Sequence, residues 1–137
     1  MSQTSGGVFG KVLRWSAWWL LFALFTFGLL SREAPRVGAA VLPAALTFWA
    51  SKSVHLGGYA LLSALVAWLP ASPRLRVALW LLLAAHAPAT EYLQQFVEGR
   101  HPSVADVGID WAGLCLGLAL ARLMSGRERR EQPPGAA

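Results

Sequence analysis

The sequence predicts an all-α fold, an integral membrane four-helix bundle with both termini in the cytoplasm. The chain has 137 residues, of which 55% are hydrophobic and 14% charged. Its apolar residues fall in long runs, and an apolar run of roughly 18 or more residues is typical of a membrane-spanning helix. Basic residues lie at the ends of these runs, as membrane topology requires. We therefore predict one transmembrane domain over residues 1–124 and a polar, disordered tail over residues 125–137.

The first predicted span covers about residues 13–31. Lys11 precedes it, and Trp15, Trp18 and Trp19 lie at its start, as expected where a helix enters a membrane interface. The apolar run is longer than that of a signal peptide, so we interpret it as a retained helix.

A short segment containing Pro35 and Pro43 separates this span from the next. Proline interrupts a helix because it lacks a backbone N–H and clashes with the preceding turn. We therefore expect an interfacial segment that lies along the membrane surface, with Phe48 and Trp49 as its anchors.

The second span is predicted over about residues 53–69 and the third over about residues 77–97. The second span is short, and Lys52 beside it can reach the interface with its long side chain. Pro88 lies inside the third span, where it should leave the carbonyl of Ala84 without its helical partner.

The fourth span is predicted over about residues 105–124. Gly113 and Gly117 are four residues apart and so share one helix face, which permits close approach of another helix. Because Cys115 is the only cysteine, the chain can form neither an intrachain disulfide nor a thiolate metal cage.

The distribution of basic residues predicts the orientation. With four spans, the N-terminus, the turn between the second and third spans and the tail share one side. The basic residues of that side are Lys11, Arg14, Arg74, Arg76, Arg122, Arg127, Arg129 and Arg130. Those of the other side are Arg32, Arg36, Lys52 and Arg100. The positive-inside rule makes the first side cytoplasmic. Because these residues form no basic stripe interleaved with aromatic residues, we expect no nucleic-acid partner.

Polar residues from three spans meet near the opposite, extracytoplasmic side in this topology. Spans two and four begin there and span three ends there. The candidate ligand-binding residues are Lys52, His55, Tyr59, Glu91, Gln94, Arg100, Asp106 and Asp110. Lys52, His55 and Tyr59 follow i, i+3, i+7 spacing and share one helix face. Because such groups are costly near lipid, their convergence predicts a polar cluster with partners, water or a function.

Two sequence elements resemble the VanZ-like family of small bacterial membrane proteins, named for an accessory factor in teicoplanin resistance. The first is "SKSVHLGGY", with Lys52, His55 and Tyr59. The second is "EYLQQFVEGRHPSVADVGIDWAGLCLG". Its matching residues are Glu91, Gln94, Arg100, Ser103, Asp106 and Gly113, and Gly117 continues the pattern. The resemblance covers about residues 50–120.

Two positions depart from the family pattern. Ser51 replaces the usual aspartate, and Asp110 replaces the usual asparagine. The resemblance implies a four-helix fold in the bacterial inner (cytoplasmic) membrane, a link to the cell envelope and, in some members, lowered glycopeptide sensitivity. It does not supply a biochemical mechanism.

The polar cluster permits several interpretations. A structural ion-pair network of Glu91, Arg100 and Asp106 would pin the outer loop to the helices. Alternatively, Lys52, His55 and Arg100 would present positive charge to an anionic group such as a lipid phosphate. Catalysis would require Glu91 and His55 to act as an acid/base pair, with no nucleophile evident. Ser103 is better interpreted as a helix N-cap, with Asp106 as its capping-box partner.

The sequence offers no compact metal-ligand spacing, although His55, Glu91, Asp106 and Asp110 include ligand types for a divalent ion. We therefore predict no metal and no cofactor. One alternative is His86, which lies mid-span among small residues. It is best interpreted as a neutral histidine bonded to a backbone carbonyl, but such a residue can serve as an axial ligand of a tetrapyrrole metal.

The function favoured by the sequence is binding of an anionic envelope lipid or lipid-linked precursor, which would alter envelope properties or glycopeptide sensitivity. Membrane lipids are the predicted partners. A non-catalytic subunit of a larger membrane complex, such as a pigment or haem complex, is the alternative. An enzyme acting on a lipid phosphate is the third hypothesis.

Overall fold

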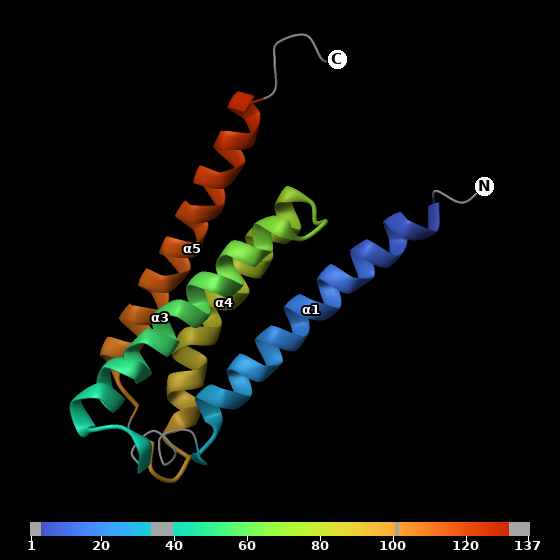
Figure 1. Ribbon diagram of the computed structural model, residues 1–137. Coiled ribbons are helices and arrows are strands. Elements are labelled where there is room, and N and C mark those ends of the chain that lie inside the picture. Colours follow the sequence, from blue (N-terminus) through green and yellow to red (C-terminus); the bar gives the residue numbers. More distant parts are fainter. Residues whose placement is uncertain (1–3, 34–39, 101, 132–137) are drawn as a thin grey trace.

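The computed structural model describes residues 4–33, 40–100 and 102–131, and within these residues it contains four helices and no strand. Helix α1 covers Thr4–Leu30, α3 covers Ala44–Trp68, α4 covers Pro73–Gln94 and α5 covers Val104–Glu131. The predicted all-α class is confirmed. The start of α1, the α3–α4 turn and the end of α5 lie at one end of the molecule, and the opposite helix ends gather at the other (Figure 1).

Two of these helices are long and apolar enough to cross a membrane, over Gly7–Leu30 in α1 and Val104–Ser125 in α5. Among the described residues, α3 and α4 are long enough but contain no equally apolar stretch, because polar groups such as Lys52 and Glu91 lie within them. Membrane crossing by all four helices therefore stays a prediction.

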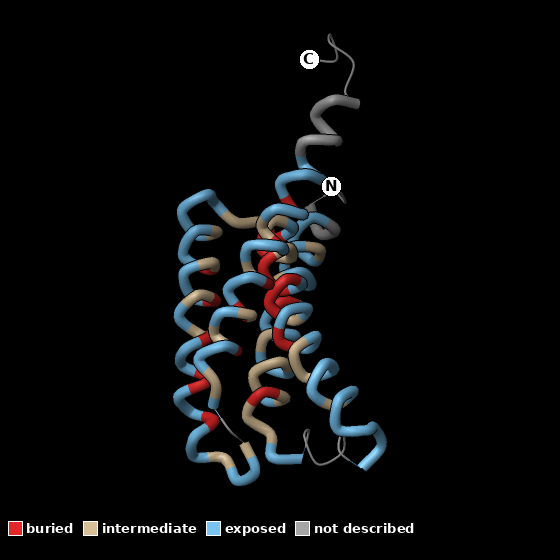
Figure 2. The backbone as a smooth tube through the Cα atoms, turned by 90° about the vertical axis from the view of Figure 1, so that its left-hand side faces the viewer, coloured by how far each residue is buried: buried red, intermediate tan, exposed pale blue. Residues whose placement is uncertain are grey.

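The buried residues lie on the sides of the helices that face one another (Figure 2). Exposed residues on every helix include large apolar ones. Examples are Phe9 and Phe27 in α1, Leu61 in α3, Leu81 in α4 and Leu123 in α5, all more than half exposed. A helix apolar on both its inward and outward faces suits a lipid environment better than water.

Helix α3 begins well before the predicted start at residue 53. Pro43 immediately precedes its first residue, where the missing N–H of proline breaks no helical bond. Phe48 and Trp49 therefore belong to the first turns of α3, where both are exposed, and not to a separate interfacial segment. The rest of that predicted segment includes Pro35 and Arg36, which lie outside the described residues.

The other predicted helices differ from the structure at their ends. Helix α1 starts earlier than residue 13, and α4 runs from Pro73 to Gln94 instead of over residues 77–97. Helix α5 continues to Glu131, so the first part of the predicted tail is helical. Residues 132–137 of that tail lie outside the described residues.

The two predicted glycines bring α3 and α5 into backbone contact. A Cβ atom at Gly113 would lie 2.3 Å from the carbonyl oxygen of Leu56, and one at Gly117 would lie 2.1 Å from that of Ala60. These distances are too short for any side chain. Ser63 strengthens the same interface, because its hydroxyl donates to the carbonyl of Leu114 at 2.8 Å. The predicted close helix approach through these glycines is confirmed.

An apolar core lies between α1, α3 and α4. It consists of Trp18, Leu62, Val66, Leu69, Leu79 and Leu83, with further aromatic side chains packed against it. The indole N–H of Trp18 donates to the carbonyl of Leu62 at 3.2 Å, so this buried tryptophan joins α1 to α3.

Pro88 lies inside α4, as predicted. The carbonyl that it frees, that of Ala84, accepts a hydrogen bond from the indole N–H of Trp111 in α5 at 3.0 Å. A backbone group exposed by the proline is thus satisfied by a neighbouring helix.

Candidate functional site

The start of α3, the end of α4 and the start of α5 carry a buried polar cluster, at the end of the molecule opposite the start of α1 and the end of α5. Its most buried members are His55, Glu91, Gln94, Asp106 and Asp110, none more than 7% exposed. The structure therefore brings together side chains from the three helices that the sequence pointed to.

Two side-chain pairs link α3 to α5. Lys52 forms an ion pair with Oδ1 of Asp106. One turn deeper, Nδ1 of His55 forms a hydrogen bond with Oδ1 of Asp110 at 2.8 Å. Asp110 is fully buried, so this bond lies out of reach of solvent. The i, i+4 spacing of the two aspartates matches the i, i+3 spacing of Lys52 and His55, because both repeats advance about one helical turn.

Glu91 of α4 accepts a hydrogen bond from the backbone at the beginning of α5. Its Oε2 accepts a hydrogen bond from the backbone N–H of Ser103 at 2.7 Å, immediately before the first helical residue, Val104. In the capping box predicted from the sequence, Asp106 would accept this N–H. The structure corrects that assignment, since Asp106 pairs with Lys52 and Glu91 of α4 replaces it.

Arg100 and Gln94 both attach to the C-terminal end of α1. Arg100 donates through Nε to the carbonyl of Ser31 at 3.2 Å and through a terminal nitrogen to that of Gly28 at 2.9 Å. Gln94 donates to the carbonyl of Leu29 at 3.1 Å. Helix C-termini carry unpaired carbonyls and attract cations, which explains this contact.

Arg100 is partly buried but keeps its charge. Burial lowers the pKa of its guanidinium from the ordinary value, and the charge of nearby Glu91 opposes this. An arginine starts from so high a pKa that it stays protonated. No ion pair closer than 4.0 Å joins Arg100 to a carboxylate among the described residues.

Tyr59 belongs to a different group of residues from Lys52 and His55. Its hydroxyl forms a hydrogen bond with Nδ1 of His86 at 2.8 Å, and Nε2 of His86 bonds to the hydroxyl of Thr26 in α1 at 2.9 Å. Both ring nitrogens of His86 are therefore engaged by hydroxyl groups and not by the predicted carbonyl. Axial ligation of a metal by His86 would require one of these bonds to break.

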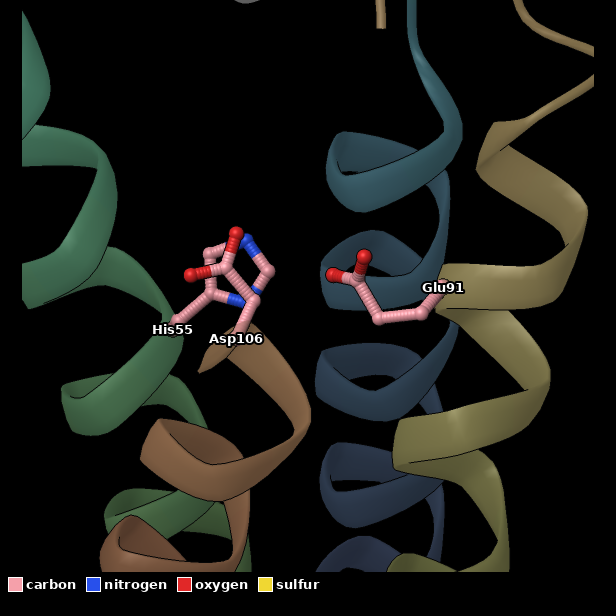
Figure 3. Close-up of side chains that lie close together, drawn as sticks. All are labelled: His55, Glu91 and Asp106. Carbon is pink, nitrogen blue, oxygen red and sulfur yellow. The ribbon is translucent and has the colours of Figure 1, made fainter. Parts of the chain in front are cut away.

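Three metal-ligand side chains come together within the polar cluster. His55, Glu91 and Asp106 each offer one ligand atom, and these atoms lie within 4.8 Å of one another. The three side chains come from α3, α4 and α5 and face a common space (Figure 3). Such a grouping could not be read from the spacing in the sequence, because each residue lies on a separate helix.

A cavity of about 380 Å³ lies beside the cluster, between α1 and the first half of α3. Its walls are mainly apolar, from residues such as Leu24, Phe25 and Val54, and His55 and Arg100 contribute polar groups to the same lining. A volume of this size is typical of small-ligand sites. The cavity can therefore hold an apolar chain whose polar end contacts His55 or Arg100.

Sequence reasoning missed the contribution of α1 to this region. The carbonyls of Gly28, Leu29 and Ser31 accept hydrogen bonds from Arg100 and Gln94. The hydroxyl of Thr26 is hydrogen-bonded to His86. Backbone carbonyls carry no signature in the sequence. The one available signal is Thr26, a hydroxyl group inside an otherwise apolar run.

Comparisons with models of protein families, with curated proteins and with solved structures find no match to this chain.

Proposed function

We propose that this chain is a multi-pass protein of the bacterial cytoplasmic membrane, and that the cavity between α1 and α3 binds an anionic lipid or a lipid-linked precursor. The observation that supports this is the composition of the cavity wall, which combines apolar side chains with Arg100 and His55. An amphiphile with an acidic head group matches both parts of that wall. The apolar outward faces of all four helices support the membrane location.

Arg100 is the group best placed to contact the anion. A guanidinium has five N–H donors, and two of the nitrogens are bonded to carbonyls of α1. The remaining donors can bind a phosphate while the arginine stays attached to the helix. Lys52 is less suitable, because its ammonium is already paired with Asp106.

Lipid retention tests the proposal directly. Purified protein would be exchanged into phosphatidylglycerol, a polyprenyl phosphate or zwitterionic phosphatidylethanolamine, and native mass spectrometry would count the lipids that stay bound. We expect one anionic lipid per chain in preference to the zwitterionic one. Arg100→Gln should reduce retention about 10-fold, since one charge-assisted hydrogen bond contributes about 1.5 kcal/mol or more.

Two further variants complete the lipid experiment. Gly28→Leu adds a side chain to the cavity wall at a position where a Cβ meets no atom within 4 Å, and it should displace the lipid. Arg32→Gln is the matched control, because Arg32 is 61% exposed and lies outside the cavity lining. Equal retention by wild type and Arg100→Gln, or no preference for anionic lipid, would contradict the proposal. Stoichiometric co-purification with a large complex would favour the subunit hypothesis instead.

The VanZ-like resemblance leads us to propose a role in the cell envelope. A strain that expresses the wild-type chain would then be less sensitive to teicoplanin, and Arg100→Gln would remove this difference while the protein still accumulates.

Topology is tested in a Cys115→Ala background with a membrane-impermeant maleimide. Glu98→Cys should react in intact cells, whereas Ser72→Cys should react only after permeabilisation.

A further inference from the structure

The space between His55, Glu91 and Asp106 has the donor set of a metal site. A ring nitrogen and two carboxylate oxygens lie within 4.8 Å of one another, and all three residues are buried. The Glu91 carboxylate points from α4 toward the other two side chains (Figure 3). Nitrogen and oxygen donors of this kind suit zinc and neighbouring divalent transition metals.

One buried carboxylate oxygen of Glu91 has no hydrogen-bond partner among the described residues, which indicates a place for a cation. Oε2 accepts the Ser103 N–H, but Oε1 is buried and has no hydrogen-bond partner among the described residues. Glu91 as a whole is only 5% exposed. A buried carboxylate oxygen without a donor or cation costs several kcal/mol, so a cation at this oxygen would remove a real penalty.

His55 is already oriented as a metal ligand would be. Its Nδ1 is bonded to the fully buried Asp110, which leaves Nε2 as the nitrogen for a further ligand. Metal-binding histidines nearly always use their second nitrogen in this way, toward a carboxylate or a carbonyl, because the bond fixes the tautomer and the ring plane.

The charges of the cluster favour a cation. Glu91, Asp106 and Asp110 are carboxylates, and the ammonium of Lys52 is the one lysine or arginine group in ion-pair contact with them among the described residues. Three carboxylates against the Lys52 ammonium and the nearby Arg100 guanidinium leave one negative charge in a buried region. Lys52 occupies Oδ1 of Asp106, so Oδ2 remains available for a metal.

Two cavities border the cluster. The cavity between α1 and α3 reaches His55, and a separate cavity of about 370 Å³, lined by residues that include Pro88 and Ser103, reaches Glu91. The two cavities therefore border two of the three proposed ligands, and an entry path is one requirement of a metal site.

We propose that His55, Glu91 and Asp106 bind one divalent metal ion of the zinc type, with Asp110 as a positioning residue for His55. Zinc–ligand bonds of about 2.0–2.1 Å place tetrahedral ligands roughly 3.4 Å apart. The three ligand atoms therefore move together by about an ångström on binding, which rotation of the side chains can supply. Three protein ligands leave a fourth position open, as in zinc sites that bind water or substrate. The site shares His55 with the cavity proposed to bind lipid, but Arg100 is not one of its ligands, so Arg100→Gln separates the two proposals.

Zinc titration of the full chain tests this site. The protein would be purified in detergent without a histidine tag, stripped with a chelator and titrated with Zn²⁺ against a chromophoric competitor. We expect one site per chain, lost in His55→Ala and in Glu91→Gln. Asp110→Asn should retain the site with affinity lowered about 10–100-fold, the usual effect of removing the partner of a metal-binding histidine.

The control is Glu98→Gln, which removes a carboxylate that is 74% exposed near the same end of the molecule and should leave zinc binding unchanged. X-ray absorption on the wild-type protein keeps the test valid if a variant fails to fold. We expect one imidazole and oxygen ligands at about 2.0–2.1 Å. The absence of saturable binding, an equal loss in Glu98→Gln, or a sulfur ligand from Cys115 would overturn the proposal.

Discussion

The α3–α5 pair and the two outer helices, α1 and α4, are joined by different kinds of contact. In the α3–α5 pair, Gly113 and Gly117 let the backbones touch, with the carbonyls of Leu56 and Ala60 beneath them. Besides the apolar core, the outer helices are attached through side chains that donate to carbonyls. These donors are Trp18, Trp80, Gln94, Arg100 and Trp111. The pair therefore depends on close backbone packing in addition to its side-chain bonds, whereas the outer helices depend on the apolar core and a few bonds to carbonyls.

This difference divides the candidate site. His55, Asp106 and Asp110 lie on the α3–α5 pair, whose close packing fixes their separation. Glu91 lies on α4, and Arg100 lies in the loop that reaches α1. The proposed metal site thus combines a rigid half with a half whose position depends on the attachment of an outer helix.

The largest effect should follow from filling the α3–α5 interface. Gly113→Leu combined with Gly117→Leu places side chains where backbone carbonyls lie 2.3 and 2.1 Å from the added Cβ atoms. Overpacking costs about 1–3 kcal/mol per site, and more where backbone must move. We expect no folded protein to be recovered, as measured by size-exclusion chromatography and by membrane accumulation.

Gly108→Ala is the matched control for that experiment. Gly108 lies on the same helix, but a Cβ there meets no atom within 4 Å. Because alanine favours helix over glycine, this variant should be slightly more stable than wild type. Equal loss of protein in the control and in the double variant would show that α5 tolerates no change, whatever the contact.

The second largest effect concerns the buried pair within the α3–α5 half of the site. Asp110→Leu leaves His55 without its partner in a place where neither residue is accessible, and breaking a buried pair costs about 3–5 kcal/mol. His55→Leu with Asp110→Leu should recover most of the stability, because apolar residues replace the pair without leaving a lone polar group. Thermal unfolding of the detergent-solubilised protein, followed by tryptophan fluorescence, measures both variants. A double variant no more stable than Asp110→Leu would contradict this account.

The convergence of polar residues was predictable from the sequence, but their partners were not. Antiparallel spans bring the start of α3, the end of α4 and the start of α5 to one side, whatever the details of packing. Tyr59 lies apart from the other candidate residues of α3 because the seven residues from Lys52 to Tyr59 correspond to about 10 Å along the helix axis. Pairings across helices depend on side-chain rotamers and backbone carbonyls, and neither is visible in residue spacing.

Helix ends were harder to predict than helix contacts, for a physical reason. Pro43 suggested an interruption, yet proline is equally compatible with a helix start, and the structure uses it there. Conversely, Pro88 exposed the carbonyl of Ala84 as predicted, because the missing N–H has one fixed consequence within a helix.

A moderate effect should follow from weakening the attachment of α1. Arg100→Gln removes the donors to the carbonyls of Gly28 and Ser31, at a cost of about 1.5–3 kcal/mol for bonds to a charged group. We expect faster amide exchange at the end of α1 with little change in α3 and α5, as measured by hydrogen–deuterium exchange mass spectrometry. Arg32→Gln, which removes only exposed ion pairs, should leave the exchange pattern unchanged. Uniformly faster exchange in all helices would mean that α1 is not attached separately.

The smallest effect concerns the bond between Trp111 and the carbonyl of Ala84, which is one link between α4 and α5. Trp111→Phe should cost about 1 kcal/mol, because Pro88 has removed the helical partner of that carbonyl and the indole replaces it. In a Pro88→Ala background the helix supplies its own N–H, so the same substitution should cost little. Thermal unfolding of the four proteins in this double-mutant cycle gives the coupling free energy directly. A coupling near zero would show that the indole contributes packing alone and that the outer helices need no bond at this position.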